Sequence, residues 1–313
     1  MISRWAQWFN SYSSWWFVAI FVPVLVAEVA APARRAADNL SRRWLDNFAL
    51  YAGGIAIVYL LGVDGSGFAP FFDGIPNVFA AANALGGEFA VLVLGVLLGD
   101  FFLYVLHRCE HRVFLLWRFH SVHHTDQDMD ATTGLRHHPI ETAYAISITV
   151  ALACLGAPLW VAMAYAALWT AFSVLMHANL RLPERFDRLL SWIFVTPEMH
   201  LLHHARAEEF YDSNYGNVFS LWDRAFGTYR RIPRAGIDSL PIGIVTPPAR
   251  GIRSLATPWI QPFVMHDRRP DQTVRQITAP PDAEPRRRTE SSVASLSQPI
   301  GDLFHRRLDE PGP

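Results

Sequence analysis

The stretch "FAVLVLGVLLGDFFLYVLHRCEH" (residues 89–111) joins an apolar run directly to two histidines that are four residues apart. Residues 89–106 contain a single charged side chain, Asp100, and approach the length of about 20 residues that a helix needs to cross the apolar core of a bilayer. The segment therefore predicts a membrane-spanning helix whose end carries imidazole groups at the membrane surface.

Three further apolar stretches accompany this helix. Residues 15–31 and 48–63 each have about the length of one membrane crossing, the second being short. Residues 143–176 would extend about 50 Å as one helix, which is too long for a single crossing of a roughly 30 Å core. The sequence Gly156-Ala157-Pro158 supplies a natural break, so this stretch predicts a hairpin of two short or tilted helices.

The composition agrees with a membrane protein. Of the 313 residues, 51% are hydrophobic and 18% charged, whereas soluble domains carry about 25% charged residues. We expect an all-α, polytopic helical membrane protein with about five membrane helices and a cytoplasmic, histidine-rich helical cap. The alternative is a soluble protein in which these stretches are buried core helices. The net charge of −1 gives no indication of nucleic-acid binding.

Arginine placement predicts the orientation. Residues 34–43, between the first two apolar stretches, contain four arginines, whereas residues 64–88 contain no basic residue. By the positive-inside rule, the first loop is cytoplasmic and residues 64–88 form a loop outside. The helix at 89–106 then returns the chain to the cytoplasm, and a hairpin at 143–176 keeps both histidine-rich segments there.

The chain divides into three predicted regions. Residues 1–88 hold N-terminal membrane helices and loops, residues 89–235 a histidine-rich domain that includes the hairpin, and residues 236–313 a C-terminal extension. The extension is rich in Pro, Arg, Ser and acidic residues, and we expect disorder from about residue 268.

Eleven of the 13 histidines lie between residues 107 and 204, and one pattern occurs twice, as "HSVHH" at 120–124 and "HLLHH" at 200–204. Residues i, i+3 and i+4 of a helix share a face, so each triplet projects its imidazoles one way. His107 and His111 add a pair one turn apart. One triplet alone is equally compatible with a hydrogen-bonded surface cluster. The three clusters together indicate a metal site, because imidazole is the commonest metal ligand.

The number of imidazoles favours a dinuclear centre. A catalytic zinc usually takes three protein ligands, and the three clusters supply eight histidines. Ligand type alone leaves zinc, copper, iron and nickel open. The Glu-x-x-His ligands of soluble di-iron bundles and the HExxH motif of zinc proteases are both missing from the sequence.

Two segments resemble the membrane fatty acid hydroxylase/sterol desaturase superfamily: "DFFLYVLHRCEHRVFLLWRFHSVHHTDQDMDATTGLRHHPIE" and "VTPEMHLLHHARAEEFYDSNYGNVFSLWDRAFGTY". The resemblance covers about residues 90–230. H-x-x-x-H, H-x-x-H-H and a second H-x-x-H-H occur in the family's order, with "HANLRLP" between the last two. The resemblance implies a non-haem di-iron centre at the cytoplasmic face of a helical membrane bundle, which activates O2 against a lipid.

The resemblance also implies a ligand set. The motif histidines, with the family's intervening histidine, are His107, His111, His120, His123, His124, His177, His200, His203 and His204. Some family members have another histidine four residues before the intervening one, where this chain has Ser173, so the ninth and tenth ligands stay open. His138, next to Pro139, fits a further family position better than His137, and either is a candidate for an additional or outer hydrogen-bonding role.

Acidic and amide side chains near these motifs are candidates for supporting roles. Asp100 shares a helix face with His107 and His111. An acid inside a membrane span is costly and by default points to function, so we expect Asp100 to hold an imidazole N–H; the alternative is a polar contact between helices. Asp212 is a candidate for the same role, and Asn214 for binding a metal through water.

We therefore expect an O2-dependent membrane oxidoreductase with two irons per chain that hydroxylates or desaturates a lipid (sterol, fatty acyl or related). No cytochrome b5 or Rossmann motif is present, so the electrons come from a separate partner: a ferredoxin, a b5-like protein or another reductant. The alternatives are a zinc-dependent lipid hydrolase and a non-enzymatic metal-binding membrane protein. The lipid, the choice between hydroxylation and desaturation, and the oligomeric state stay open.

Overall fold

The computed structural model describes residues 4–35, 40–60, 77–244 and 256–265, and within these ranges the regular structure is helical, with two isolated β-bridges and no strand. The all-α prediction is thus confirmed for the described residues. The predicted disordered tail from residue 268, and most of the predicted outer loop, lie outside them.

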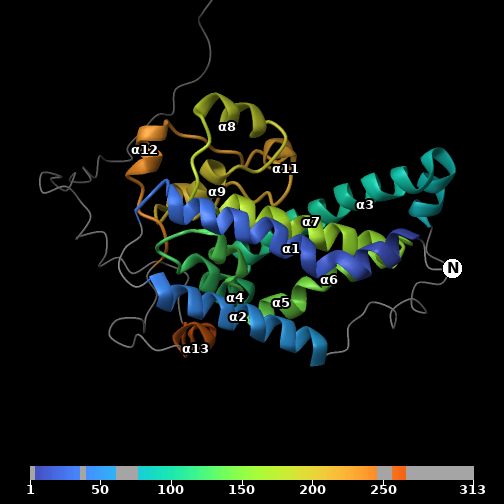
Figure 1. Ribbon diagram of the computed structural model, residues 1–313, viewed down its shortest axis with the longest axis horizontal. Helices are drawn as coiled ribbons and strands as arrows, with labels where there is room; N and C mark the ends of the chain where they lie inside the picture. The colour runs from blue at the N-terminus through green and yellow to red at the C-terminus, as the bar shows by residue number, and fades with distance from the viewer. Residues whose placement is uncertain (1–3, 36–39, 61–76, 245–255, 266–313) are drawn as a thin grey trace, which may run out of the picture. The chain divides into compact units, whose positions relative to one another are not determined.

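Long helices lie side by side in the bundle of Figure 1. Helix α7 (Leu159–His177) packs against both α1 (Arg4–Ala30) and α3 (Val78–Arg112). Helix α2 (Leu40–Leu60) packs against the short helix α5 (Pro139–Ala145). The bundle leads into a cap of short helices: α8 (Glu184–Leu190), α9 (Pro197–His203), α10 (Glu208–Tyr211), α11 (Leu221–Ala225) and α12 (Arg234–Asp238). Helix α13 (Thr257–Val264) packs against α4 (Phe114–His124).

Two helices of the described chain, α3 and α7, are long and apolar enough to cross a membrane. The apolar parts at Phe17–Ala30 and Pro139–Cys154 are shorter. Gly156, at φ +83°, and Pro158, which caps α7, form the turn between α6 (Ser147–Cys154) and α7, at the break that the sequence predicts. The described helices therefore supply two spans by length and composition, against the five expected.

Helix α3 begins earlier than predicted. It starts at Val78, where Asn77 caps it by accepting a hydrogen bond from the backbone of Ala80. Residues 78–88, expected in a loop, are thus helical, and the interpretation of this part was wrong. The helix is interrupted at Gly86 and Gly87, the latter at φ +62°. Gly87 takes up a left-handed backbone conformation that other residues rarely adopt, so the kink occurs there.

Close contact between α3 and α7 depends on two glycines four residues apart, a small-x-x-x-small arrangement typical of packed membrane helices. A methyl group added at Gly95 would lie 1.9 Å from Val161 Cγ1, and one at Gly99 would lie 2.6 Å from Tyr165 Cδ1. The helices therefore approach closely only because both positions lack a side chain.

We expect Gly95→Ala to lower the free energy of unfolding by about 1–3 kcal/mol, because the added methyl forces α3 and α7 apart. Heat-induced unfolding of the protein in detergent measures this. Gly236→Ala is the control, since its methyl would meet only the end of the Ile232 side chain, at 3.3 Å. Equal midpoints for the two variants would contradict the close packing.

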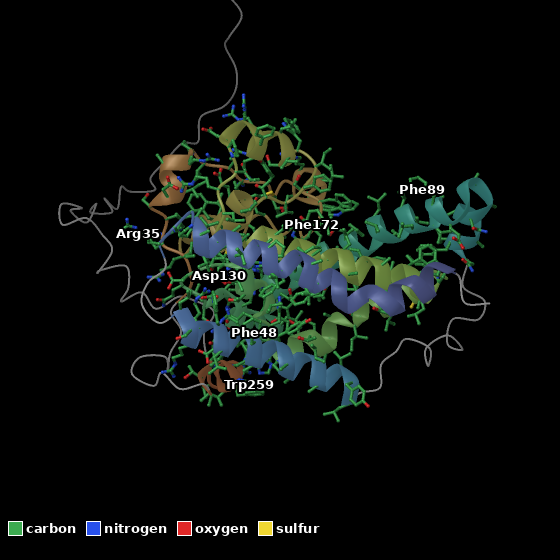
Figure 2. The ribbon with its side chains drawn as sticks, viewed as in Figure 1. Arg35, Phe48, Phe89, Asp130, Phe172 and Trp259 are labelled. Atoms are coloured by element: carbon green, nitrogen blue, oxygen red, sulfur yellow. The ribbon has the colours of Figure 1, made fainter. Side chains whose placement is uncertain are left out.

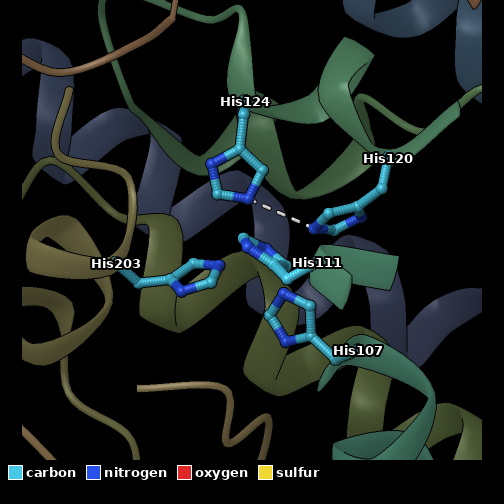
Figure 3. Close-up of side chains that lie close together, drawn as sticks. All are labelled: His107, His111, His120, His124 and His203. Carbon is cyan, nitrogen blue, oxygen red and sulfur yellow. Dashed lines mark hydrogen bonds between the residues drawn. The ribbon is translucent and has the colours of Figure 1, made fainter. Parts of the chain in front are cut away.

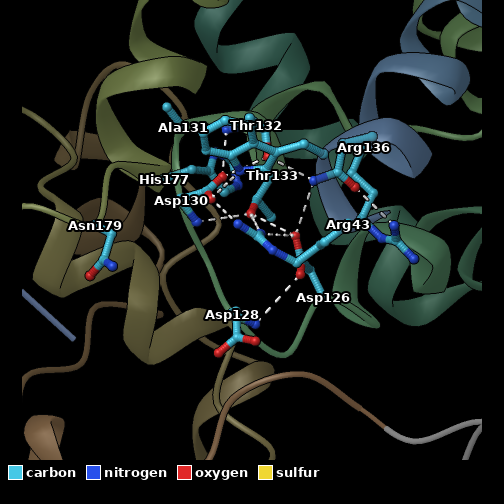
Figure 4. A network of polar contacts seen from close by, with 12 residues as sticks. Arg43, Asp126, Asp128, Asp130, Ala131, Thr132, Thr133, Arg136, His177 and Asn179 are labelled. Carbon is cyan, nitrogen blue, oxygen red and sulfur yellow. Dashed lines mark hydrogen bonds and ion pairs between the residues drawn. The ribbon is translucent and has the colours of Figure 1, made fainter. Parts of the chain in front are cut away.

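A buried polar network ties α2 to the segment that follows the first histidine triplet (Figure 4). Arg43 of α2 pairs with Asp126 at 2.9 Å and with Asp130. Arg136 donates to Asn47 of α2 and, through Nε, to the backbone oxygen of Val122, both at 2.9 Å. Figure 2 shows Asp130 between the ribbons of α1 and α2. The network fixes the path of residues 126–136 beside the histidines.

Candidate metal centre

All nine histidines predicted as ligands converge in two buried groups. In each group, one potential ligand atom per residue lies within 4.8 Å of all the others. The five-histidine group (Figure 3) contains His107, His111, His120, His124 and His203. The four-histidine group contains His123, His177, His200 and His204. Each of the nine side chains is at most 5% exposed.

Four helix segments deliver these side chains: the ends of α3 and α7, helix α4 (Phe114–His124), and α9 with the residue that follows it. We expected the three imidazoles of each triplet to point the same way, but each triplet is divided between the two groups. His120 and His124 join the five-histidine group while His123 joins the other, and His200 and His204 join the four-histidine group while His203 crosses over. In each triplet, the first and last histidines thus belong to one group and the middle histidine belongs to the other, so each triplet connects the two groups.

Backbone carbonyls orient three of the imidazoles. Because a carbonyl only accepts, the hydrogen must be on Nδ1 of each ring, which leaves the Nε2 lone pair facing inward. The three bonds are His107 to Tyr215 at 2.8 Å, His203 to Ser213 at 2.7 Å, and His177 to Ser173 at 2.6 Å. Ser173 therefore supports the site through its backbone oxygen.

A carboxylate that the sequence analysis missed holds a fourth ring. Glu141 Oε1 lies 2.8 Å from His120 Nδ1 and 2.9 Å from His137 Nδ1. The available signal was its position four residues after His137 at the start of a helix. Glu110 lies next to it, with its Oε2 3.5 Å from His120 Nδ1. These acids polarise the His120 ring on the side away from the group.

The donor geometry fits metal ions. Nε2 atoms lie 3.2 Å apart in His120–His124, 3.0 Å in His123–His177, 2.9 Å in His177–His200 and 3.2 Å in His200–His204. Two nitrogens each about 2.1 Å from one ion, a usual zinc–imidazole distance, are roughly 3.0 Å apart when the bonds are at right angles. The Nε2 atoms of His107, His111 and His203 are buried without a hydrogen-bond partner. Unpaired buried nitrogens are costly, and a shared cation would satisfy them.

Three of the imidazoles, those of His124, His203 and His204, are neutral at physiological pH, as metal binding requires. Burial lowers the pKa of His203 to about 3. Burial and the neighbouring imidazoles also lower the pKa values of His124 and His204 well below 6.5. In His120, burial is outweighed by the carboxylates of Glu110 and Glu141, and the pKa is raised.

Asp100 does not touch an imidazole in the described structure, contrary to expectation. It accepts hydrogen bonds from the backbone of Val218 at 2.9 Å and Phe219 at 3.0 Å, from Trp222 Nε1 at 2.9 Å, and from Tyr165 at 3.4 Å. The alternative, a polar contact between helices, is the observed one. Asp100 anchors the loop whose Tyr215 carbonyl orients His107, so its support for the site is indirect.

Of the other residues predicted to support the site, some lie beside the histidine groups and some do not. Asp212 Oδ1 lies 3.7 Å from His111 Nδ1, beside the five-histidine group. Asn214, the candidate for binding a metal through water, donates its amide N–H groups to the backbone oxygens of Met199 and Arg230, and its amide oxygen accepts from the backbone N–H of Arg230. His137 stacks on His123, with ring centroids 4.6 Å apart, whereas His138 bonds the backbone of Ile140 and Trp259. The structure therefore places His137, rather than His138, against the site.

Residues beyond the predicted domain boundary at 235 close the site. The backbone N–H of Gly243 donates to His204 O at 3.1 Å, and that of Ile244 donates to His124 O at 2.7 Å. Residues 243–244 thus join the last residues of the two triplets, a contact that the sequence analysis missed. Gly243 has φ +73°, and a methyl there would lie 2.4 Å from the backbone oxygen of Asp126. Helix α13 also contacts α4, since the side chain of Gln261 donates a hydrogen bond to Ser121 Oγ at 3.0 Å.

We expect Gly243→Ala to lower metal occupancy and to destabilise the fold by about 1–3 kcal/mol, because it strains this connection. Metal content after dialysis and the thermal unfolding midpoint measure the two effects. Gly236→Ala again serves as the control. A Gly243→Ala protein with unchanged metal content and midpoint would show that residues 243–244 do not hold the triplets.

Comparison with known proteins agrees with this geometry. Residues 92–228, which contain all nine histidines, match the fatty acid hydroxylase family. The chain is 34% identical over 170 residues to ornithine lipid hydroxylase OlsE of Rhizobium tropici, covering 54% of this chain and 50% of that protein. It is 33% identical over 137 residues to alkylglycerol monooxygenase of Xenopus tropicalis, covering 42% and 28%.

A further relative is fatty acid hydroxylase vlmA of Lecanicillium sp, 31% identical over 153 residues, covering 41% of this chain and 39% of that protein. The chain thus spans half or less of the length of these relatives. No solved structure matches it significantly. Residues 92–228 thus match a fatty acid hydroxylase domain, and over this region the chain is similar to members of the fatty acid hydroxylase/sterol desaturase superfamily.

Proposed function

We propose that this protein is an O2-dependent lipid hydroxylase or desaturase that uses two irons per chain. The observation that carries the proposal is the convergence of nine buried imidazoles in two adjacent groups. Their position within a fatty acid hydroxylase domain supports iron, and the names of the relatives support a lipid substrate.

The five-histidine group would hold one iron and the four-histidine group the other. When bound, and with electrons from a separate reductant, the pair would supply the oxidising power needed to cleave an unactivated C–H bond with O2. A ferredoxin or b5-like donor is compatible with the absence of a recognisable redox domain motif in the sequence.

The protein's own side chains prepare the site. The backbone oxygens of Tyr215, Ser213 and Ser173 fix three imidazoles with Nε2 inward, and Glu141 holds His120. Burial of all nine rings keeps water out, which strengthens every electrostatic interaction inside. Tyr144 donates a hydrogen bond to Glu110 at 2.8 Å and so keeps this second carboxylate next to His120.

We further propose that α3 and α7 are two of about five membrane helices and that the histidine site faces the cytoplasm. The apolar character of α3 and α7 and the arginines between α1 and α2 support this. Labelling a cysteine introduced at the exposed Arg188, in a background without Cys109 and Cys154, tests it. Labelling only from the outer face would contradict the orientation.

Oxygen-isotope incorporation tests the activity. Iron-loaded protein is incubated in lipid nanodiscs with ferredoxin, its reductase, NADPH and ¹⁸O2, and the lipids are analysed by mass spectrometry. Hydroxylation predicts lipids that gain one ¹⁸O atom, and desaturation predicts lipids that lose two hydrogens, both only when O2 and the reductant are present. All-imidazole groups also suit zinc. Lipid hydrolysis without O2 or reductant would instead establish the hydrolase alternative.

A further inference from the structure

A cavity of about 200 Å³ lies apart from the two histidine groups, at the adjoining ends of α1 and α2. Its described lining includes Glu28 and Arg34 from the end of α1 and the residues after it, Trp44 from α2, Asp130, Asn179 and Ile242. None of the nine histidines is among the described residues that line it. Figure 4 shows four of the lining residues, Arg43, Asp128, Asp130 and Asn179.

Glu28, an acidic residue that lines this cavity, has one carboxylate oxygen without a hydrogen-bond partner. Glu28 is only 5% exposed, and its Oε1 accepts hydrogen bonds from the backbone N–H groups of Ala131 and Asn179. Its Oε2 is buried and has no hydrogen-bond partner. An unpaired oxygen of this kind costs about 1–3 kcal/mol or more, so the site is suited to a ligand that donates a hydrogen bond.

Arg34, a basic residue that lines the same cavity, has one guanidinium nitrogen without a hydrogen-bond partner. Arg34 Nη2 donates to the backbone oxygen of Leu240 at 2.8 Å, whereas Nη1 is buried without a partner. Arg43, which also lines the cavity, is already paired with Asp126 and Asp130. Two residues that line this cavity thus each carry an unpaired buried atom, a carboxylate oxygen on Glu28 and a guanidinium nitrogen on Arg34, and together these atoms complement a ligand that carries both an ammonium and an acidic group.

The surroundings indicate a lipid as the source of such a ligand. Apolar side chains, among them Val29 and Met129, complete the lining. The outer face of α1 continues from Val29, 64% exposed, to Val26, 63% exposed, and Val22. An acyl chain whose head group occupies the cavity would therefore find an apolar helix face beside it.

Two residues that line the cavity belong to segments that also support the four-histidine group. Glu28 holds the backbone of Asn179, two residues after His177. Ile242 directly precedes Gly243, whose N–H bonds His204 O. A head group bound here would therefore hold its lipid beside the same segments that position His177 and His204.

We propose that this cavity binds the zwitterionic head group of the substrate lipid, with a primary ammonium on Glu28 Oε2 and an anionic oxygen on Arg34 Nη1. The inference rests on the proposed lipid-oxidising function and narrows its substrate class. A primary ammonium donates hydrogen bonds to Glu28, whereas a trimethylated ammonium has no N–H to donate and is larger.

Native mass spectrometry of the metal-loaded protein in detergent tests this, without O2 or reductant, so that binding is measured separately from turnover. The probes are dioleoyl phosphatidylethanolamine and dioleoyl phosphatidylcholine, which differ only in methylation of the amine. We expect the ethanolamine lipid to bind about 10- to 100-fold more tightly, as expected for one charged hydrogen bond. Soluble O-phosphoethanolamine is the third probe, and we expect it to bind far more weakly than the lipid.

Glu28→Gln is the informative variant, because it keeps an oxygen for Ala131 and Asn179 but removes the charge. It should lose the preference for the ethanolamine lipid, and Arg34→Gln should weaken binding of both phospholipids. Glu184→Gln, which removes an exposed carboxylate on α8, should retain the wild-type preference. Metal content reports whether each variant is folded.

Equal binding of the two phospholipids by the wild-type protein, or an unchanged preference in metal-loaded Glu28→Gln, would overturn the proposal. Binding of O-phosphoethanolamine as tightly as the lipid would overturn its assignment to a lipid. A preference that Glu28→Gln abolishes, in a protein that oxidises no lipid, would leave the cavity assignment standing and reject the proposed function instead.

Discussion

His204→Ala and His124→Ala should each reduce the metal content from two ions to about one per chain and lower lipid oxidation to below about 1% of wild type. His204 belongs to the four-histidine group and His124 to the five-histidine group, so each substitution opens one site and leaves the ligands of the other in place. Loss of an outer hydrogen-bond partner alone commonly costs 10- to 100-fold, and loss of a ligand should cost more.

Elemental analysis and a turnover assay on the same preparations measure both quantities. His138→Asn is the matched control: His138 lies outside both groups, and asparagine can still cap α5 as the histidine does. This variant should keep two ions. A His204→Ala protein that retains two ions and full activity would remove His204 from the ligand set.

Glu141→Gln should lower metal affinity or turnover by about 10- to 100-fold. Its carboxylate is within hydrogen-bonding distance of both His120 and His137, and a neutral amide weakens these charge-assisted bonds and leaves His120 less strongly oriented. Competition with a chelator measures the affinity, and kcat is determined separately from KM.

Glu198→Gln provides the control for Glu141→Gln. Glu198 pairs with Arg231 and Arg234 in the cap and contributes to neither histidine group. Removing its charge should leave metal affinity within about twofold of wild type. If Glu141→Gln behaves in the same way, the carboxylate does not support the metal centre.

The clustering of the histidines and the α6–α7 turn could be predicted because both depend on local sequence. Spacing of three and four residues places imidazoles on one side of a helix, and Gly156 with Pro158 favours a break between two helices. The division of each triplet between two groups could not be predicted, because it depends on how α4 and α9 face one another in the folded protein.

The hydrogen-bond partners of Asp100 and the roles of Glu141 and Gly243 escaped prediction for a related reason. Asp100 accepts hydrogen bonds from Val218, Phe219 and Trp222, and the backbone N–H of Gly243 donates to the backbone oxygen of His204. Both contacts join segments that are far apart along the chain and share no sequence pattern. Glu141 is close in sequence to His137, but its contact with His120 depends on α5 packing against α4. Periodicity indicates which face of a helix is buried and does not identify the partner it meets.

The central claim is that two irons share this nine-histidine centre, and metal stoichiometry tests it most directly. Protein produced in cells supplied with ⁵⁷Fe, purified in detergent, is analysed for metal content and by Mössbauer spectroscopy. We expect two irons per folded chain with the spectrum of a coupled pair. Folded protein from the same cells with no bound metal, or with one isolated iron per chain, would contradict it.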